Sequence, residues 1–316
     1  MNIDDLSPGL RAICRFQKTD SVEVAIRGIC SAILKQSEIE QPPVALKPLL
    51  SALNVRYSWS NSFNQKNRER HGTASLNSVD GNLTISLNTH HIKNWRRDRF
   101  SIAHELTHAI IIRTLRTPEL IETLDESKTF FNQLEKVCNL GAAEILMPTK
   151  MIRSAIRHTH LNSDSLLSLY DLFLVSRDAL IWRLAQMMPG TSVIRWRNHA
   201  RNSGEPKCLR VVACYPSYEK GGNRPWLPIG ATTKHIIPNA IETIEIDSLQ
   251  EVTIELSGKS ISCEAIITSF KNRSSRSNRP LFQGMEIPDD EYSGSDLILF
   301  VRNISSTRST WFEKIT

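Results

Sequence analysis

The spacing of apolar residues along the chain predicts a largely helical first part. Within it, apolar positions recur three and four residues apart, as on the buried face of a helix. Helices are expected over residues 21–37, 45–53, 98–112, 127–147, 149–158, 164–173 and 177–188. Strands are expected over residues 55–59, 73–76 and 83–87. The Asp80-Gly81-Asn82 sequence between the last two predicts a hairpin.

After Pro189-Gly190 the apolar residues alternate with polar ones instead. This period of two is typical of strands with one buried face. Strands are expected over residues 209–215, 241–246, 252–256, 261–270, 281–287 and 297–301. A second domain rich in strands therefore starts near residue 195, and the fold class is α+β.

The composition is that of an ordinary globular protein. The chain has 316 residues, of which 40% are hydrophobic and 23% are charged, and its formal net charge is +6. That mild basic excess is more typical of a surface balance than of a nucleic-acid partner. The six cysteines stand singly, without a C-x-x-C pair, which indicates a reducing cytoplasm. We expect no secretory signal in residues 1–10 and no membrane span.

The chemistry is concentrated in His104-Glu105-Leu106-Thr107-His108, on the expected helix 98–112, for which Asp98 is the expected N-cap. The four-residue spacing places both imidazoles on one helix face, so that two successive turns can hold one zinc ion. Glu105 stands where a carboxylate can take a proton from the attacking water and pass it to the leaving amine. The apolar residues around this segment predict a buried helix, in which unpaired histidines would be costly.

A catalytic zinc needs a third protein ligand from another element. The helix 127–147 and the residues before it offer Glu126, Glu135 and Glu144. Spacing alone leaves the choice among these three open.

Two segments resemble the ImmA/IrrE family of metallopeptidases. They are Arg97–His108, which reads R-D-R-F-S-I-A-H-E-L-T-H, and Glu135–Pro148, which reads E-K-V-C-N-L-G-A-A-E-I-L-M-P. The resemblance covers roughly residues 40–190. It implies a zincin-like fold, with Glu135 as the third ligand of a zinc ion or, as an alternative working metal, manganese. Glu144 matches a recurrent family position that is not a ligand.

The chain departs from the family pattern at three places beside these motifs. Thr107 stands where glycine is usual, Cys138 where alanine is usual, and Gly141 where an aromatic residue is usual. None of these departures removes a ligand or Glu105. They concern the packing around the second helix.

The resemblance also implies a layout and a function. Residues 1–150 are expected to form the zincin-like domain, residues 151–192 a helix-turn-helix-like segment, and residues 193–316 a strand-rich domain, GAF-like in some relatives, that senses a signal or recruits the substrate. Family members act on helix-turn-helix transcriptional repressors in stress responses and in mobile elements. The expected activity is therefore zinc-dependent cleavage of such a repressor in the cytoplasm.

Two other functions are also compatible with the sequence. One is a ligand-sensing regulator with a non-catalytic metal site. Another is a DNA-binding regulator that uses Arg177 and Arg183 of the helix pair 164–188 together with the basic loop 271–280. For a peptidase, His158, His160 and Tyr170 are candidates for stabilising the substrate oxyanion, and none is favoured.

Overall fold

The computed structural model divides the chain into two compact units. It describes residues 6–60, 74–79, 82–88, 95–115, 128–157, 160–188, 191–198, 209–215, 247, 249–256, 259–270 and 296–303. Within these residues, the first unit holds the chain up to Met151 together with Phe173–Ser176. The second unit holds Ile152–Leu172 and the described residues from Arg177 onward. The division into residues 1–150, 151–192 and 193–316 stays a prediction.

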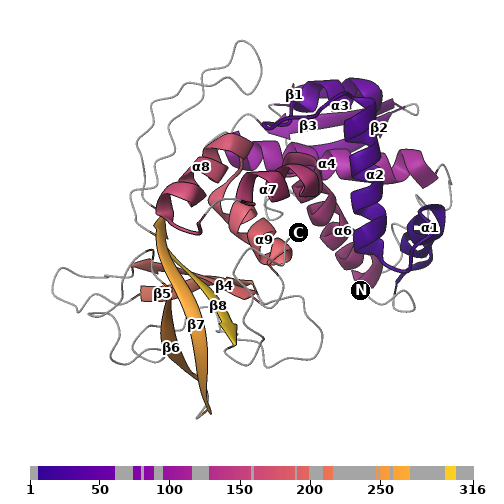
Figure 1. Cartoon of the computed structure of the whole chain (residues 1–316). Helices are drawn as coiled ribbons and strands as arrows, with labels where there is room; N and C mark the ends of the chain where they lie inside the picture. The colour runs from indigo at the N-terminus through magenta and orange to yellow at the C-terminus, as the bar shows by residue number, and fades with distance from the viewer. Residues whose placement is uncertain are drawn as a thin grey trace. The chain divides into compact units, whose positions relative to one another are not determined.

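The first unit combines helices with one small sheet (Figure 1). Its helices are α1 (Pro8–Phe16), α2 (Val22–Gln36), α3 (Leu46–Ala52), α4 (Trp95–Leu115) and α6 (Lys128–Leu146), and α7 (Thr149–Ile156) begins in it. The sequence did not predict α1, although Pro8 lies in its first turn and Leu10, Ile13 and Cys14 form its buried face. Helix α2 packs against α1 and α6.

The sheet of this unit is three-stranded, with the order β1-β3-β2. Its strands are β1 (Val55–Ser60), β2 (Ala74–Val79) and β3 (Asn82–Asn88). Strands β2 and β3 pair antiparallel, which confirms the hairpin, while residues 80 and 81 of its turn lie outside the described residues. Strand β1 pairs parallel with β3, so β2 is at one edge of the sheet. Helix α3 packs against β1, and α4 packs against β2 and β3.

Helix α4 begins at Trp95, and the prediction that Asp98 is its N-cap is wrong. Asp98 lies within the first turn and is buried. An acidic residue there is favoured by the positive end of the helix dipole, so the same sequence signal fits both positions. The predicted burial is confirmed, because Ile102, Leu106 and Ala109 have no exposed surface.

Arg99 fixes the start of α4 to two other segments of the same unit. Its Nε donates a hydrogen bond to the Leu174 carbonyl oxygen at 3.2 Å, and its Nη2 donates one to the Val44 carbonyl oxygen at 2.9 Å. Burial and the charge of Arg96 lower the pKa of Arg99 to about 10, so the guanidinium stays charged at neutral pH. Charge-assisted bonds of this kind are stronger than neutral ones. They set the position of the helix that carries the histidines.

The second unit contains helices and a five-stranded sheet. The helices are α8 (Ser163–Phe173, up to Leu172 in this unit) and α9 (Arg177–Met187). The strands are β4 (Thr191–Asn198), β5 (Leu209–Tyr215), β6 (Leu249–Leu256), β7 (Lys259–Phe270) and β8 (Asp296–Asn303). All described pairings are antiparallel, and the order is β5-β4-β8-β7-β6.

The sequence analysis did not predict strand β4, and the reason is physical. It lies inside the sheet between β5 and β8, and α9 packs against it. Its residues 191–195 are all buried, so they lack the alternation that marks a half-exposed strand. Arg195, within this run, forms an ion pair with Asp178 of α9. The strands expected at residues 241–246 and 281–287 lie outside the described residues.

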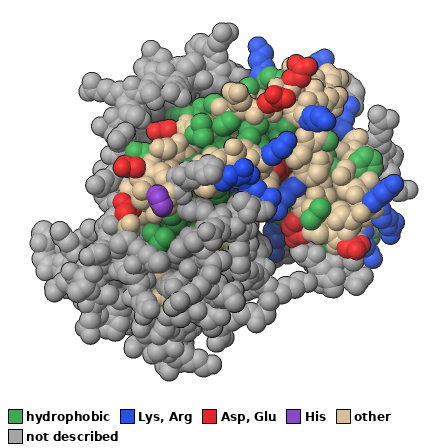
Figure 2. All heavy atoms as spheres, viewed as in Figure 1, with side chains coloured by type: hydrophobic (Ala, Val, Ile, Leu, Met, Phe, Trp, Pro, Cys, Tyr) green, Lys and Arg blue, Asp and Glu red, His purple; other side chains and the backbone are tan. Residues whose placement is uncertain are grey.

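The mixed α+β class is confirmed, and the GAF-like character of the strand-rich part stays a prediction. Among the described helices, none has the length and apolar composition required to cross a membrane. On the face shown in Figure 2, lysine and arginine side chains of the described residues lie among acidic and apolar ones.

Candidate metal centre

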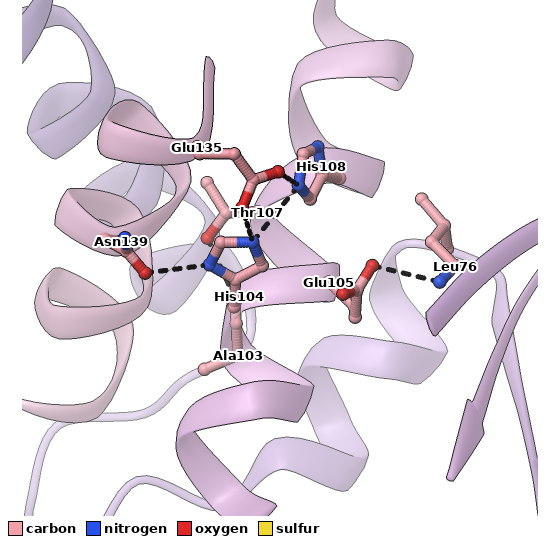
Figure 3. Close-up of polar contacts among 8 residues, drawn as sticks. All are labelled: Leu76, Ala103, His104, Glu105, Thr107, His108, Glu135 and Asn139. Atoms are coloured by element: carbon pink, nitrogen blue, oxygen red, sulfur yellow. Dashed lines mark hydrogen bonds and ion pairs between the residues drawn. The ribbon is translucent and has the colours of Figure 1, made fainter. Parts of the chain in front are cut away.

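The two histidines and Glu135 converge across the interface between α4 and α6 (Figure 3). The His104 and His108 Nε2 atoms are 3.2 Å apart. Glu135 Oε2 lies 3.3 Å from the His104 nitrogen, and Glu135 Oε1 lies 3.3 Å from the His108 nitrogen. The side chains are 14%, 17% and 34% exposed for His104, His108 and Glu135, so the group is sheltered but open to solvent. Among the described residues, this is the group of three that can hold a metal ion.

These separations fit the demands of a divalent metal. A zinc ion about 2.1 Å from each donor in tetrahedral geometry requires donors about 3.4 Å apart. The 3.2 Å between the two histidine nitrogens is close to that value, and each nitrogen lies 3.3 Å from a different oxygen of Glu135. Two imidazole nitrogens and one carboxylate also form the usual donor set of a catalytic site that keeps one position open. The arrangement can therefore hold a divalent metal ion.

Asn139 of α6 contacts the opposite nitrogen of the His104 ring. The His104 Nδ1 and Asn139 Oδ1 atoms are 3.0 Å apart. Burial lowers the pKa of His104, but the hydrogen bond and charge of Glu135 and the charge of Glu105 outweigh it, so the pKa lies above its ordinary value. The sequence analysis missed Asn139, although it stands four residues after Glu135 and thus on the same helix face.

Glu135 is held as a carboxylate by its two histidine partners. Hydrogen bonds from His104 and His108 lower its pKa to about 2, against the opposing effect of burial. Glu135 therefore remains charged under all ordinary conditions. Protonation of Glu135 therefore does not compete with metal binding near neutral pH.

We predict that zinc affinity falls as the pH is lowered from about 8 to about 6, by at least tenfold. An imidazole must be neutral to bind a metal, and the raised pKa of His104 means that protons begin to compete above its ordinary range. The dissociation constant, measured by competition with a chromophoric chelator at several pH values, tests this. A constant affinity over that range would contradict it.

Glu105 projects from α4 toward β2 and away from Glu135 (Figure 3). One of its oxygens accepts a hydrogen bond of 2.9 Å from the Leu76 backbone N–H. Burial raises the pKa of Glu105 above its ordinary value, against the charges of His108 and His104, which lower it. A carboxyl group with a raised pKa is better suited to accept and return a proton near neutral pH. The edge strand β2 thus orients this side chain.

Glu144, the other third-ligand candidate among the described residues, has different partners. Glu144 is buried and accepts hydrogen bonds from the Thr149 N–H and hydroxyl, at 2.8 and 2.7 Å. It therefore caps the first residue of α7, and this structural role accounts for a glutamate at this recurrent family position. Glu126 and His158 lie outside the described residues. His160 and Tyr170 belong to the second unit.

The burial of Arg183 argues against a direct contact of this residue with DNA. Arg183 has no exposed surface, and its Nη1 donates a hydrogen bond of 3.1 Å to Gln186 Oε1. A guanidinium buried in this way cannot reach a phosphate without rearrangement of α9. Arg177 is partly exposed, and the basic loop 271–280 lies outside the described residues.

Comparison with known proteins supports the family resemblance over one segment of the chain. Residues 59–185, which include both motif segments, match the family described as Peptidase M78, the IrrE N-terminal-like domain. These residues belong to the ImmA/IrrE family. The match is narrower than the resemblance noted over residues 40–190. A Mycobacterium tuberculosis transcriptional regulator of known structure aligns with 88% of this chain and 75% of its own, at 11% identity and a TM-score of 0.45. No curated protein matches the chain.

Two departures from the ImmA/IrrE pattern prove to be in direct contact. Gly141 of α6 faces Thr107 of α4, and a Cβ atom added to Gly141 would lie 2.3 Å from Thr107 Cγ2. Thr107 is fully buried, and its hydroxyl donates a hydrogen bond of 2.8 Å to the Ala103 carbonyl oxygen. In this chain the larger side chain of the pair is Thr107 on α4, whereas the family usually has its larger, aromatic residue on α6, at the position of Gly141. The two departures compensate each other.

We predict that Gly141→Ala lowers the free energy of unfolding by about 1–3 kcal/mol, the usual cost of overpacking a core. In a helix this change alone would otherwise stabilise by about 1 kcal/mol. In a Thr107→Ala background the two clashing atoms are gone, and the loss should shrink by more than half. Urea unfolding of the four proteins in the double-mutant cycle measures this coupling. Additive effects would show that the two positions are independent.

Proposed function

We propose that this protein is a zinc-dependent endopeptidase that cleaves a helix-turn-helix transcriptional repressor in a stress or mobile-element response. The observation that carries the proposal is the convergence of His104, His108 and Glu135, with Glu105 on the same helix. Membership of residues 59–185 in a metallopeptidase family supports the same chemistry. The repressor as substrate rests on the family's known targets.

His104, His108 and Glu135 would hold the metal, and their two nitrogens and one oxygen suit zinc better than manganese, which prefers oxygen donors. When bound, zinc lowers the pKa of water and polarises the scissile carbonyl. Glu105 then takes a proton from the attacking water and passes it to the leaving amine. The Leu76 N–H keeps the Glu105 carboxylate in one orientation while it does so.

A non-catalytic metal site is the rival interpretation. A purely structural zinc site is usually closed by four protein ligands. Here the three-ligand group is partly exposed, and the half-buried carboxyl group of Glu105, whose pKa is raised, lies next to it along α4. These features favour catalysis over a structural role.

The proposal is tested with the purified full-length chain, loaded with zinc, and the repressor encoded beside its gene. We expect two fragments whose masses sum to that of the repressor plus one water. Removing the metal with a chelator should stop cleavage, and returning zinc should restore it. Manganese is the second metal to test. An intact repressor in the presence of a zinc-loaded protein would contradict the proposed substrate, and cleavage that survives metal removal would contradict the proposed chemistry.

A further inference from the structure

We propose that Asn139 is a positioning residue for the metal site: it acts through His104 and does not itself bind the metal. The inference rests on the proposed function in one respect, because it requires the group to bind metal. The carrying observation is the 3.0 Å contact between Asn139 Oδ1 and His104 Nδ1, on the ring edge opposite the other ligands.

The contact fixes which His104 nitrogen carries the proton. Nε2 is the atom that faces His108 and Glu135, at 3.2 and 3.3 Å. It must offer its lone pair to a metal, so a neutral His104 must carry its proton on Nδ1. Asn139 Oδ1 is an acceptor at hydrogen-bond distance from that proton. The amide therefore selects the tautomer that can bind.

The contact also fixes the orientation of the ring. Asn139 stands one helical turn after Glu135, so α6 presents a ligand and the partner of another ligand on one face. Val137, Cys138 and Leu140 around it are buried, which anchors this turn of the helix. His104 is thus held from both ring edges by side chains of α6. Such support lowers the entropy that a flexible ligand would lose on binding.

Asn139 is neutral, whereas many histidine ligands pair with a carboxylate. A neutral acceptor attracts the Nδ1 proton less strongly than a carboxylate does. The imidazole would therefore donate less electron density to the metal, which would remain a stronger Lewis acid. Replacing the amide by a carboxylate should therefore tighten metal binding. Replacing it by an apolar group of similar size should weaken binding, because both the tautomer and the ring orientation are then unrestrained.

The test compares three variants with the wild-type full-length chain. Asn139→Leu removes the acceptor at similar volume, and Asn139→Asp keeps it. Asn132→Leu makes the same apolar change at an exposed position of the same helix. For each, the zinc dissociation constant is measured by chelator competition, with zinc alone as the probe. The visible absorption of the cobalt-loaded proteins reports the ligand geometry, and urea unfolding of the metal-free proteins reports folding.

We expect Asn139→Leu to weaken zinc binding by about 10–100-fold, with an altered cobalt spectrum. Asn139→Asp should bind zinc at least as tightly as wild type, and Asn132→Leu should not differ from it. Wild-type affinity in Asn139→Leu would overturn the inference. So would equal weakening in Asn139→Asp, because a packing role would then explain both. If wild type binds no zinc, this inference and the proposed function both fall, whereas zinc binding without repressor cleavage contradicts the proposed function alone.

Discussion

Replacing Glu105 with glutamine is expected to slow repressor cleavage by about 10²–10⁴-fold, the usual contribution of a general acid–base group. Glutamine has nearly the same shape, and its amide oxygen can still accept the hydrogen bond from the Leu76 N–H. It cannot take a proton from water. The rate of fragment formation under single-turnover conditions, at equal zinc loading, measures the loss.

The control for this prediction is the zinc affinity of the Glu105→Gln variant. Glu105 points toward β2 and away from Glu135, so the variant should keep wild-type zinc affinity within a few-fold (Figure 3). A variant that loses both zinc and activity would make Glu105 part of metal binding. Equal cleavage by both proteins would remove it from the assigned role.

Replacing Glu135 with glutamine is expected to weaken zinc binding by a hundredfold or more. Structural zinc sites reach about 10–16 kcal/mol with four ligands, so a single ligand contributes about 3 kcal/mol, which corresponds to about a hundredfold. The charge matters as much as the oxygen, because this carboxylate, with a pKa of about 2, is the group's anionic member. The zinc dissociation constant and the zinc content after dialysis measure the effect.

Glu144→Gln is the matched control on the same helix. Sequence spacing left Glu126, Glu135 and Glu144 open as third ligand, and the bonds of Glu144 to Thr149 predict no effect on zinc affinity. The variant should instead lose some stability, of about 1 kcal/mol, because it weakens the cap of α7. Wild-type zinc content in Glu135→Gln would refute the third-ligand assignment.

Local sequence patterns predicted most helices of the first 190 residues because apolar residues recur in them at helical spacing. The segment Ser127–Met147 became α6 (Lys128–Leu146), and Arg177–Met188 became α9 (Arg177–Met187). The exception, α1, is only nine residues long and offers few positions for a period to show. Strand β4 was missed because burial on both faces removes the alternation.

The long-range contacts of the site could not be predicted from the sequence. The two histidines are four residues apart on one helix, so the sequence alone reveals the pair. Glu135 lies on another helix, and its approach to His104 depends on how α4 and α6 pack, which residue spacing does not show. Asn139 and the Leu76 N–H are likewise visible only once α6 and β2 lie beside α4. The Thr107–Gly141 contact shows the same limit, since two apparent departures from a family pattern have their meaning only as a pair.

The most direct test of the account is a zinc titration of the chelator-stripped, full-length protein with the repressor present. Cleavage should be absent without metal, rise in proportion to added zinc, and stop rising at one equivalent per chain, since one group of three ligands was found in the described part of the chain. Cleavage that does not depend on zinc, or that saturates only well beyond one equivalent, would contradict the assignment of His104, His108 and Glu135 as the catalytic metal site.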